Sequence, residues 1–172
     1  LDLDIPERQI HFNGAGRIST ITLRERLDSH RLIEEFMIAA NVAAAKTLED
    51  RHLPVMYRIH EPPALEKVEA LGQALNGLGI KLAKGVKISP KTFASVLRQA
   101  EDADKGALVS EIILRSQSQA VYGPAKLGHF GLALRSYCHF TSPIRRYSDL
   151  LVHRALISAL GLGTDGLGRD PG

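Results

Sequence analysis

Two consecutive arginines, Arg145 and Arg146, follow a Ser-Pro pair near the end of the chain and are the side chains best suited to chemistry. The hydroxyl of Ser142 is expected to cap a helix in which Pro143 comes first and which runs to about Leu160. Arginines in a first turn oppose the helix dipole by about 0.3–1 kcal/mol each, whereas acids would be favoured there. Their presence predicts a bound anion, and phosphate is favoured because a guanidinium can bind it with two parallel hydrogen bonds.

The charged residues around these arginines leave two interpretations open. Asp149 lies four residues after Arg145 and His153 lies four after Asp149, so the three side chains can form a row on one helical face. Residues 115–154 contain six Lys and Arg and one acid, a local charge of +5, so the rest of the chain carries −2 of the formal total of +3. Such a region is either a basic solvated face, with its arginines paired to acids, or a surface for a polyanion.

The elements that must position these residues predict an α+β fold, with an N-terminal β-hairpin or strands followed mostly by helices. Alternating residues predict a strand at 1–5. Residues 9–12 and the β-prone residues 18–23 predict a β-hairpin, with a glycine-rich turn at 13–16. A long helix from residue 28 or 29 to about 51 is predicted by one apolar stripe: Leu32, Ile33, Phe36, Met37, Ala40, Ala44 and Leu48.

Prolines and glycines delimit the remaining elements. A short extended stretch is expected at 55–59, followed by a helix from Pro63 to near Gly77 and Gly79. Ser89 and Pro90 predict another helix start, by the same logic as the Ser-Pro pair above. The segment 107–120 is amphipathic, and three side chains form its predicted apolar face: Leu108, Ile112 and Leu114. The glycines of 161–172 predict a tail or linker.

Two longer runs of residues resemble one known family. The first, from His129 to Arg154, contains HFGLAL, YxHFTSPIRRYxDL and a final HR, and the second is EEFMIAAN at residues 34–41. Together they are similar to the signature regions of RNB-domain 3′→5′ exoribonucleases of the ribonuclease R and ribonuclease II type. The likeness extends to about Ile157, which implies that residues 1–160 are the C-terminal portion of an RNB catalytic domain.

This resemblance implies roles for individual residues. Arg145 matches the arginine that grips the phosphate at the cleavage point, and Glu34 matches the glutamate that contacts the sugar of the terminal nucleotide. Near the signature, five residues are candidates for RNA contacts: Lys126, His129, Ser142, Arg146 and Tyr147. Taken alone, Glu34 would belong to a solvated helix edge, and His129 would be a histidine satisfied by backbone hydrogen bonds.

The family hydrolyses RNA with Mg²⁺, which the resemblance places on closely spaced aspartates upstream of the region represented here. Asp2 and Asp4 belong to a strand that follows this cluster and do not replace it. At Leu3, some members carry an aromatic residue that stacks on the last base. The histidines show no ligand spacing with Cys138, so a zinc site is not expected either. We therefore expect no metal site in this chain and no hydrolysis by the chain alone.

Two functions of different classes follow. In the first, the intact protein is an enzyme that degrades single-stranded RNA processively from its 3′ end to nucleoside monophosphates, with Mg²⁺. In the second, the same cleft holds single-stranded RNA without cutting it. An intact acidic cluster in the upstream segment would favour the enzyme.

The composition, 44% hydrophobic over 172 residues, is that of one domain, and we expect it in the cytoplasm. No apolar run approaches the roughly 20 residues that span a bilayer, and the first residues do not resemble a signal peptide. A single cysteine cannot form an internal disulfide. We expect single-stranded RNA as the partner, no membrane and no obligate protein partner.

Overall fold

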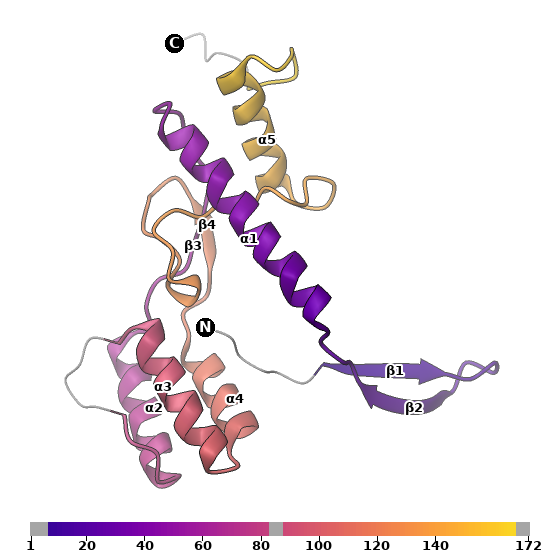
Figure 1. The fold of residues 1–172 in the computed structure, drawn as a ribbon, viewed down its shortest axis with the longest axis vertical. Helices are drawn as coiled ribbons and strands as arrows, with labels where there is room; N and C mark the ends of the chain where they lie inside the picture. Colours follow the sequence, from indigo (N-terminus) through magenta and orange to yellow (C-terminus); the bar gives the residue numbers. More distant parts are fainter. Residues whose placement is uncertain (1–6, 83–87, 168–172) are drawn as a thin grey trace.

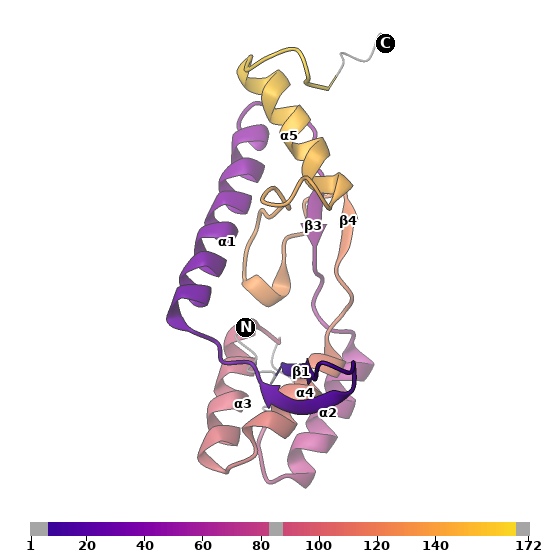
Figure 2. The ribbon, with the colours of Figure 1, turned by 90° about the vertical axis from the view of Figure 1, so that its right-hand side faces the viewer.

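In the computed structural model, residues 7–82 and 88–167 are described, and the predicted strand at 1–5 lies outside them. The architecture is α+β, as predicted, with five α-helices, four short strands and one 3₁₀ turn among the described residues (Figure 1). Two packed bodies lie at opposite ends of the long axis, and a β-hairpin projects to one side (Figures 1 and 2). No helix among the described residues is long and apolar enough to cross a membrane.

The hairpin joins strands β1 (Arg8–Phe12) and β2 (Ile18–Leu23), which pair antiparallel, and it confirms the predicted turn at 13–16. The Asn13 side chain closes this turn, because its Oδ1 accepts the backbone N–H groups two and four residues further on at 3.0 Å each. Gly16 has a φ of +73°, which glycine adopts without strain. Local hydrogen bonds, more than burial, therefore shape the hairpin.

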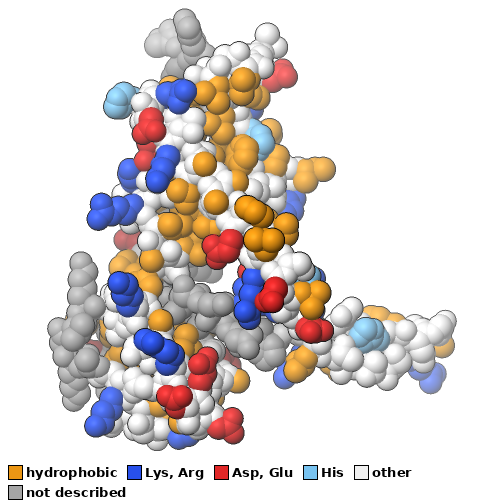
Figure 3. Space-filling model, in the orientation of Figure 1, with side chains coloured by type: hydrophobic (Ala, Val, Ile, Leu, Met, Phe, Trp, Pro, Cys, Tyr) orange, Lys and Arg blue, Asp and Glu red, His pale blue; other side chains and the backbone are white. Residues whose placement is uncertain are grey.

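Helix α1 (Asp28–Glu49) begins where the sequence predicts, but its two halves meet different surroundings. The C-terminal half buries Ala44, Ala45 and Leu48. The N-terminal half leaves Phe36 62% exposed, and hydrophobic side chains gather on the surface over this helix (Figure 3). The apolar stripe that predicts this helix is therefore buried only along its C-terminal half, because the described elements leave most of the N-terminal half uncovered.

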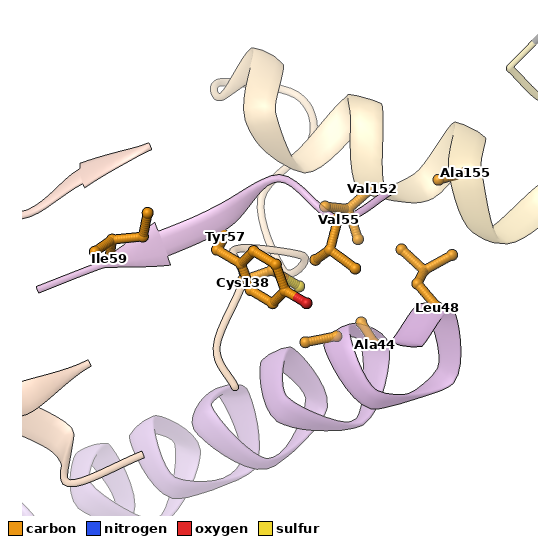
Figure 4. Packing of buried hydrophobic residues seen from close by; sticks show 9 residues of the cluster. Ala44, Leu48, Val55, Tyr57, Ile59, Cys138, Val152 and Ala155 are labelled. Carbon is orange, nitrogen blue, oxygen red and sulfur yellow. The ribbon is translucent and has the colours of Figure 1, made fainter. Parts of the chain in front are cut away.

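The first core, called the α1/α5 core below, lies between α1, α5 (Tyr147–Leu160) and a small sheet. This sheet pairs β3 (Tyr57–Ile59) antiparallel with β4 (Val121–Gly123), which confirms the extended stretch predicted at 55–59. Nine buried residues form this core: Ala44, Ala45, Leu48, Val55, Tyr57, Ile59, Cys138, Val152 and Ala155 (Figure 4). Their burial holds α5 and the sheet against α1.

The second core, called the three-helix core, lies between α2 (Leu65–Gly77), α3 (Pro90–Asp102) and α4 (Gly106–Ser116). Nine of the described residues are buried in it: Leu71, Leu75, Ile80, Phe93, Val96, Leu97, Ala100, Val109 and Ile113. The 3₁₀ turn η1 (Phe130–Leu132) reaches this core, since the ring of Phe130 lies edge-on to that of Phe93 with centroids 5.9 Å apart.

The predicted helix start at Ser89 is confirmed. Its Oγ accepts the N–H of Thr92 at 3.2 Å, and Pro90 takes the first helical position, where a missing N–H costs nothing. Helix α2 begins at Leu65, two residues after the predicted Pro63. A proline thus indicates the approximate start of a helix, and a capping side chain determines which residue is the first.

The buried face of α4 differs from the predicted one. Leu108 and Leu114 are 48% and 45% exposed, whereas Val109 and Ile113 are fully buried. Apolar side chains lie on several sides of this helix, so their spacing does not distinguish the core face from the surface. The helix also ends at Ser116, earlier than the predicted residue 120.

Candidate functional site

The signature turn, residues 142–146, precedes the last helix and does not open it. Helix α5 begins directly after Arg146, its N-cap residue, so the predicted Ser-Pro helix start is wrong. The carbonyl of Ser142 accepts the N–H groups of Arg145 and Arg146 at 3.3 and 3.1 Å, which closes a separate turn. The physical reason is Asp149 in α5, whose Oδ2 accepts the Ser142 N–H at 2.9 Å and holds the turn against the helix.

Arg146 is paired with a buried acid. Its Nε and Nη2 donate to Oδ1 and Oδ2 of Asp149 at 2.9 and 2.7 Å, and Asp149 is fully buried. Burial by itself would raise the pKa of Asp149, but hydrogen bonds from Arg146 and from the Ser142 N–H outweigh it and hold that pKa below its ordinary value. The charge of Arg146 is therefore compensated within the protein.

The predicted row of Arg145, Asp149 and His153 does not form. Asp149 accepts hydrogen bonds from Arg146 instead. His153 Nε2 hydrogen-bonds the carbonyl of Phe140 at 2.8 Å, and the two rings stack with centroids 4.2 Å apart. Because the helix starts later than predicted, the arginine that faces Asp149 is the next one along the chain.

Arg145 carries an exposed positive charge on the signature turn. Its side chain is exposed, and its Nη2 donates to the Ser142 hydroxyl at 3.4 Å. Within residues 7–82 and 88–167 it forms no ion pair. Ile144 and Tyr147 beside it are 98% and 70% exposed. The turn thus offers a guanidinium and an aromatic ring together, a combination suited to the phosphate and base of a nucleotide.

Asn41 connects the signature turn to α1. This buried side chain donates from Nδ2 to the Tyr137 hydroxyl at 3.0 Å and accepts the Phe140 N–H at Oδ1 at 2.8 Å. Segment 137–140 leads directly into the turn, so these bonds fix where the turn lies along α1. The sequence signal for this role, an amide among alanines at 39–45, was missed.

Glu34 lies on the same face of α1 as Asn41. Seven residues separate them, close to two turns at about 3.6 residues per turn, which corresponds to about 10 Å along the helix axis. The carboxylate of Glu34 forms an ion pair with Nη2 of Arg26 at 2.5 Å. Arg26 precedes the helix and was not predicted as a site residue. Glu34 is thus a partnered carboxylate on the helix face that also holds the segment leading to the turn.

Two other candidates take part in internal contacts. Lys126 forms an ion pair with Glu49 at 2.8 Å. The ring of His129 lies 4.9 Å from that of His60 and 5.2 Å from that of Tyr137. Burial first, and His60 next, lower the pKa of His129 to about 4, so its imidazole is neutral at neutral pH. The RNA contacts predicted for these two residues and for the signature turn stay predictions.

No group of three or more His, Cys, Asp or Glu comes together as a metal site within residues 7–82 and 88–167. The Mg²⁺ that the resemblance implies has no ligand set in this part of the chain. Cys138 is buried and donates from Sγ to the Asn41 carbonyl at 3.3 Å. Burial raises the pKa of this thiol to about 12, which fits a core residue and not a nucleophile.

Known proteins resemble this chain in sequence. The family model described as RNB domain matches residues 1–161. Ribonuclease R of Aquifex aeolicus is 45% identical over 160 residues, which cover 93% of this chain and 23% of that protein. Ribonuclease R of Escherichia coli is 42% identical over 156 residues, which cover 91% of this chain and 19% of that protein. The chain therefore spans about a fifth of the length of these curated relatives.

Solved structures share the fold. Mycoplasma genitalium RNase R in complex with ribose methylated single-stranded RNA matches with a TM-score of 0.87 and 29% identity, covering 96% of this chain and 26% of that chain. Yeast Ssd1, described as a pseudonuclease, matches with a TM-score of 0.71 and 21% identity, covering 85% and 18%. The second likeness shows the fold alone. Since a nuclease and a pseudonuclease share it, the fold does not decide catalysis.

Proposed function

The chain belongs to the RNB domain family, and we propose that it is the part of a 3′→5′ exoribonuclease that holds the last nucleotide of single-stranded RNA and the phosphate to be cleaved. The intact protein would degrade RNA processively from its 3′ end and release nucleoside monophosphates. Relatives named ribonuclease R, at 42% and 45% identity, support this reaction. We place the intact protein in the cytoplasm with its substrate.

One observation carries the proposal: Arg145 is exposed and has no acid partner among the described residues, on a turn that the interior holds in place. Asp149 takes up the charge of Arg146 and the N–H of Ser142, and Asn41 fixes the segment before the turn. A guanidinium on such a support meets a phosphate oxygen with little reorganisation. Preorganised charge of this kind stabilises the extra negative charge of a phosphoryl transition state.

Glu34 is proposed to accept hydrogen bonds from the hydroxyls of the terminal ribose. The 2′-hydroxyl is the group that distinguishes RNA from DNA, and a carboxylate oxygen is a strong acceptor for it. The ion pair with Arg26 is partly exposed, so it adds little stability, but it orients the carboxylate. Arg145 and Glu34 then have separate tasks, which are charge neutralisation at the phosphate and positioning of the sugar.

Hydrolysis also needs an activated water, and we propose Mg²⁺ for this step in the intact protein. The described residues provide no ligand set for it, so we expect the 172-residue chain to bind RNA without cutting it. A 5′-labelled single-stranded RNA should stay at full length with the purified chain and Mg²⁺. Shortening from the 3′ end that is lost in Arg145→Lys would show that this placement of the active site is wrong.

In a longer protein that includes the upstream segment, Arg145→Lys should reduce turnover on the order of tens to thousands of fold and RNA affinity far less. The planar guanidinium contacts one critical phosphate, whereas many contacts hold the RNA. Arg98→Lys on α3 is the matched control and should leave both quantities unchanged. Equal losses of turnover and affinity would make Arg145 a general RNA contact.

The second candidate function is a non-catalytic module that binds single-stranded RNA on the same surface. The observation in its favour is the fold shared with Ssd1, described as a pseudonuclease. Degradation by the longer protein separates the two functions. Processive shortening of RNA with Mg²⁺ supports the enzyme, and binding without shortening supports the module.

A further inference from the structure

The small sheet has an outer face, turned away from the α1/α5 core. Tyr57 of β3 and Cys138 are bridge partners, and both are buried in that core (Figure 4). Successive side chains of a strand point to opposite faces, so Arg58 lies on the outer face. Its cross-strand partner in β4 is Tyr122, and residues opposite each other in an antiparallel pair share a face. Arg58 and Tyr122 are therefore neighbours outside the core.

Three side chains are joined on this outer face. The Arg58 guanidinium lies 4.7 Å from the centroid of the Tyr122 ring. The Tyr122 hydroxyl and Nδ1 of His139 share a hydrogen bond of 2.7 Å, and their rings meet edge to face with centroids 5.6 Å apart. His139 belongs to the segment that leads into the signature turn. Tyr122 is 41% exposed, and Arg58 and His139 are partly exposed, so a ligand can reach the cluster.

The charge around His139 is positive. Burial is the first cause that lowers the pKa of His139 to about 4, and the guanidiniums of Arg146, Arg58 and Arg145 lower it further while Asp149 opposes them. Asp149 is already bonded to Arg146. Neither Arg58 nor Arg145 forms an ion pair within the described ranges of the chain. Two uncompensated guanidiniums therefore lie near an exposed aromatic cluster.

We propose that Arg58, Tyr122 and His139 form a second nucleotide subsite, which binds the base and phosphate of an unpaired RNA nucleotide next to the one that Arg145 holds. The base extends the stack of guanidinium and phenol ring, as unpaired bases do on arginine and aromatic planes. The phosphate faces Arg58 on the side toward Arg145. The hydrogen bond between Tyr122 and His139 sets the orientation of the Tyr122 ring. This subsite rests on the proposed function, because it binds the same RNA.

The base contact is tested by RNA binding to the 172-residue chain, measured by fluorescence anisotropy with oligonucleotides that carry one abasic nucleotide at each of the last few positions in turn. One abasic position should weaken wild-type binding about tenfold, the scale of one base stacked on an aromatic ring. Tyr122→Leu should weaken binding of the complete RNA by about the same factor. The abasic nucleotide at that position should then cost nothing further, because base and ring belong to one contact.

Matched variants control for folding and for loss of a ring. Phe12→Leu removes an exposed ring from the hairpin and should behave as wild type. Tyr122→Phe keeps the ring, loses the hydroxyl bonded to His139 and should retain the sensitivity to the abasic position. Thermal unfolding followed by circular dichroism checks that each variant is folded.

The phosphate contact is tested by salt dependence. Arg58→Met should reduce the slope of log affinity against log salt by about 0.7, the contribution of one phosphate contact with a single strand. Arg98→Met removes an exposed arginine from α3 and should leave the slope unchanged. An unchanged slope in Arg58→Met would remove Arg58 from the subsite.

The outcomes separate this subsite from the proposed function. If Arg145→Ala weakens RNA binding while Tyr122→Leu and Arg58→Met bind as wild type, the subsite is wrong and the proposed function stands. If the wild-type chain binds no single-stranded RNA, both are wrong. Tyr122→Leu could also lower RNA affinity by an amount that adds to the loss from an abasic nucleotide at every position. This result would mean that the substitution perturbs the fold, and it would also refute the subsite.

Discussion

Among the described residues, nine are buried in the α1/α5 core and nine in the three-helix core, but the two cores differ in the polar groups buried beside them. Next to the first core, Asn41 and Asp149 are buried. Asp149 hydrogen-bonds the signature turn, and Asn41 hydrogen-bonds the segment that leads into it. In the second, helix α4 buries Ser110 and Ser116, and Ser116 donates to a carbonyl of its own helix. The first core is therefore built to position a turn, and the second to pack helices.

This difference separates the residues that position the signature turn from the residues that stabilise the fold. Burial of a large apolar side chain contributes about 1.5–3 kcal/mol with little dependence on direction. A buried amide or carboxylate is satisfied in few arrangements, so it fixes geometry at a cost in desolvation. Substitutions in the three-helix core should lower stability and preserve the RNA affinity of the folded protein. Substitutions at Asn41 or Asp149 should lower both.

The largest loss of stability is expected for Phe93→Ala. This ring is fully buried in the three-helix core, and such truncations cost about 3–5 kcal/mol of unfolding free energy, measured by urea denaturation. RNA affinity of the folded protein should be unchanged, and Phe93→Leu offers a milder variant for that measurement. Phe36→Ala, at an exposed ring of α1, should change stability by less than about 0.5 kcal/mol. A clear affinity loss in folded Phe93→Leu would remove the distinction between the cores.

Asp149→Asn should lower stability by about 3 kcal/mol and RNA affinity as well. It leaves the largely buried Arg146 without its counter-charge and weakens the bond to the Ser142 N–H, so the signature turn loosens. The matched control is Asp102→Asn, at an exposed acid at the end of α3. Loss of stability with full RNA affinity would show that Asp149 serves packing alone.

The pH dependence of stability tests the contribution of the buried Asp149 beside the α1/α5 core. The pKa of Asp149 in the folded protein lies below its ordinary value of 3.8, so its contribution is complete above about pH 4 and is lost as the pH falls through the lowered value. The difference in unfolding free energy between wild type and Asp149→Asn should be full at pH 6 and shrink below pH 3.8. A difference that stays constant to pH 2 would exclude this ionic contribution.

A small effect on stability is expected for Arg26→Met. The pair of Arg26 with Glu34 is partly exposed, so its loss should change stability by less than about 1 kcal/mol. The preference for a 3′-terminal ribose should nevertheless fall, because the carboxylate loses its orientation. Arg24→Met breaks another exposed ion pair, with Glu7, and should leave that preference unchanged. Equal behaviour of the two variants would mean that Arg26 does not position Glu34.

Two Ser-Pro pairs show how much of the fold the sequence predicts. Ser89 begins a helix as expected, because its hydroxyl finds the N–H of Thr92 three residues on. Ser142 is also followed by a proline, but its N–H donates to Asp149 and the helix begins only at Tyr147. The spacing of residues predicts a helix cap when the capping side chain bonds a backbone N–H of the same helix. It does not predict a competing contact that depends on which carboxylate the fold buries.

For the candidate site too, the sequence predicts some residues and misses their tertiary contacts. Arg145 and Glu34 were identified by resemblance, and their roles at the phosphate and at the sugar stay predictions. Their neighbours were not predicted, since Arg26 joins Glu34 across the start of a helix. Arg58 and Tyr122 are 64 residues apart in the chain and meet only through strand pairing. Single-residue patterns do not contain such tertiary pairings.

The sugar preference of the chain tests most directly whether Glu34 and the signature turn hold the terminal nucleotide. Affinity is measured for two single-stranded RNAs that differ only in the last sugar, ribose in one and 2′-deoxyribose in the other. Wild type should prefer ribose, and so should Glu35→Ala, which removes the neighbouring exposed carboxylate. Glu34→Ala should bind both RNAs equally, because the acceptor for the sugar hydroxyls is gone. An unchanged ribose preference in Glu34→Ala would contradict this placement of the terminal nucleotide.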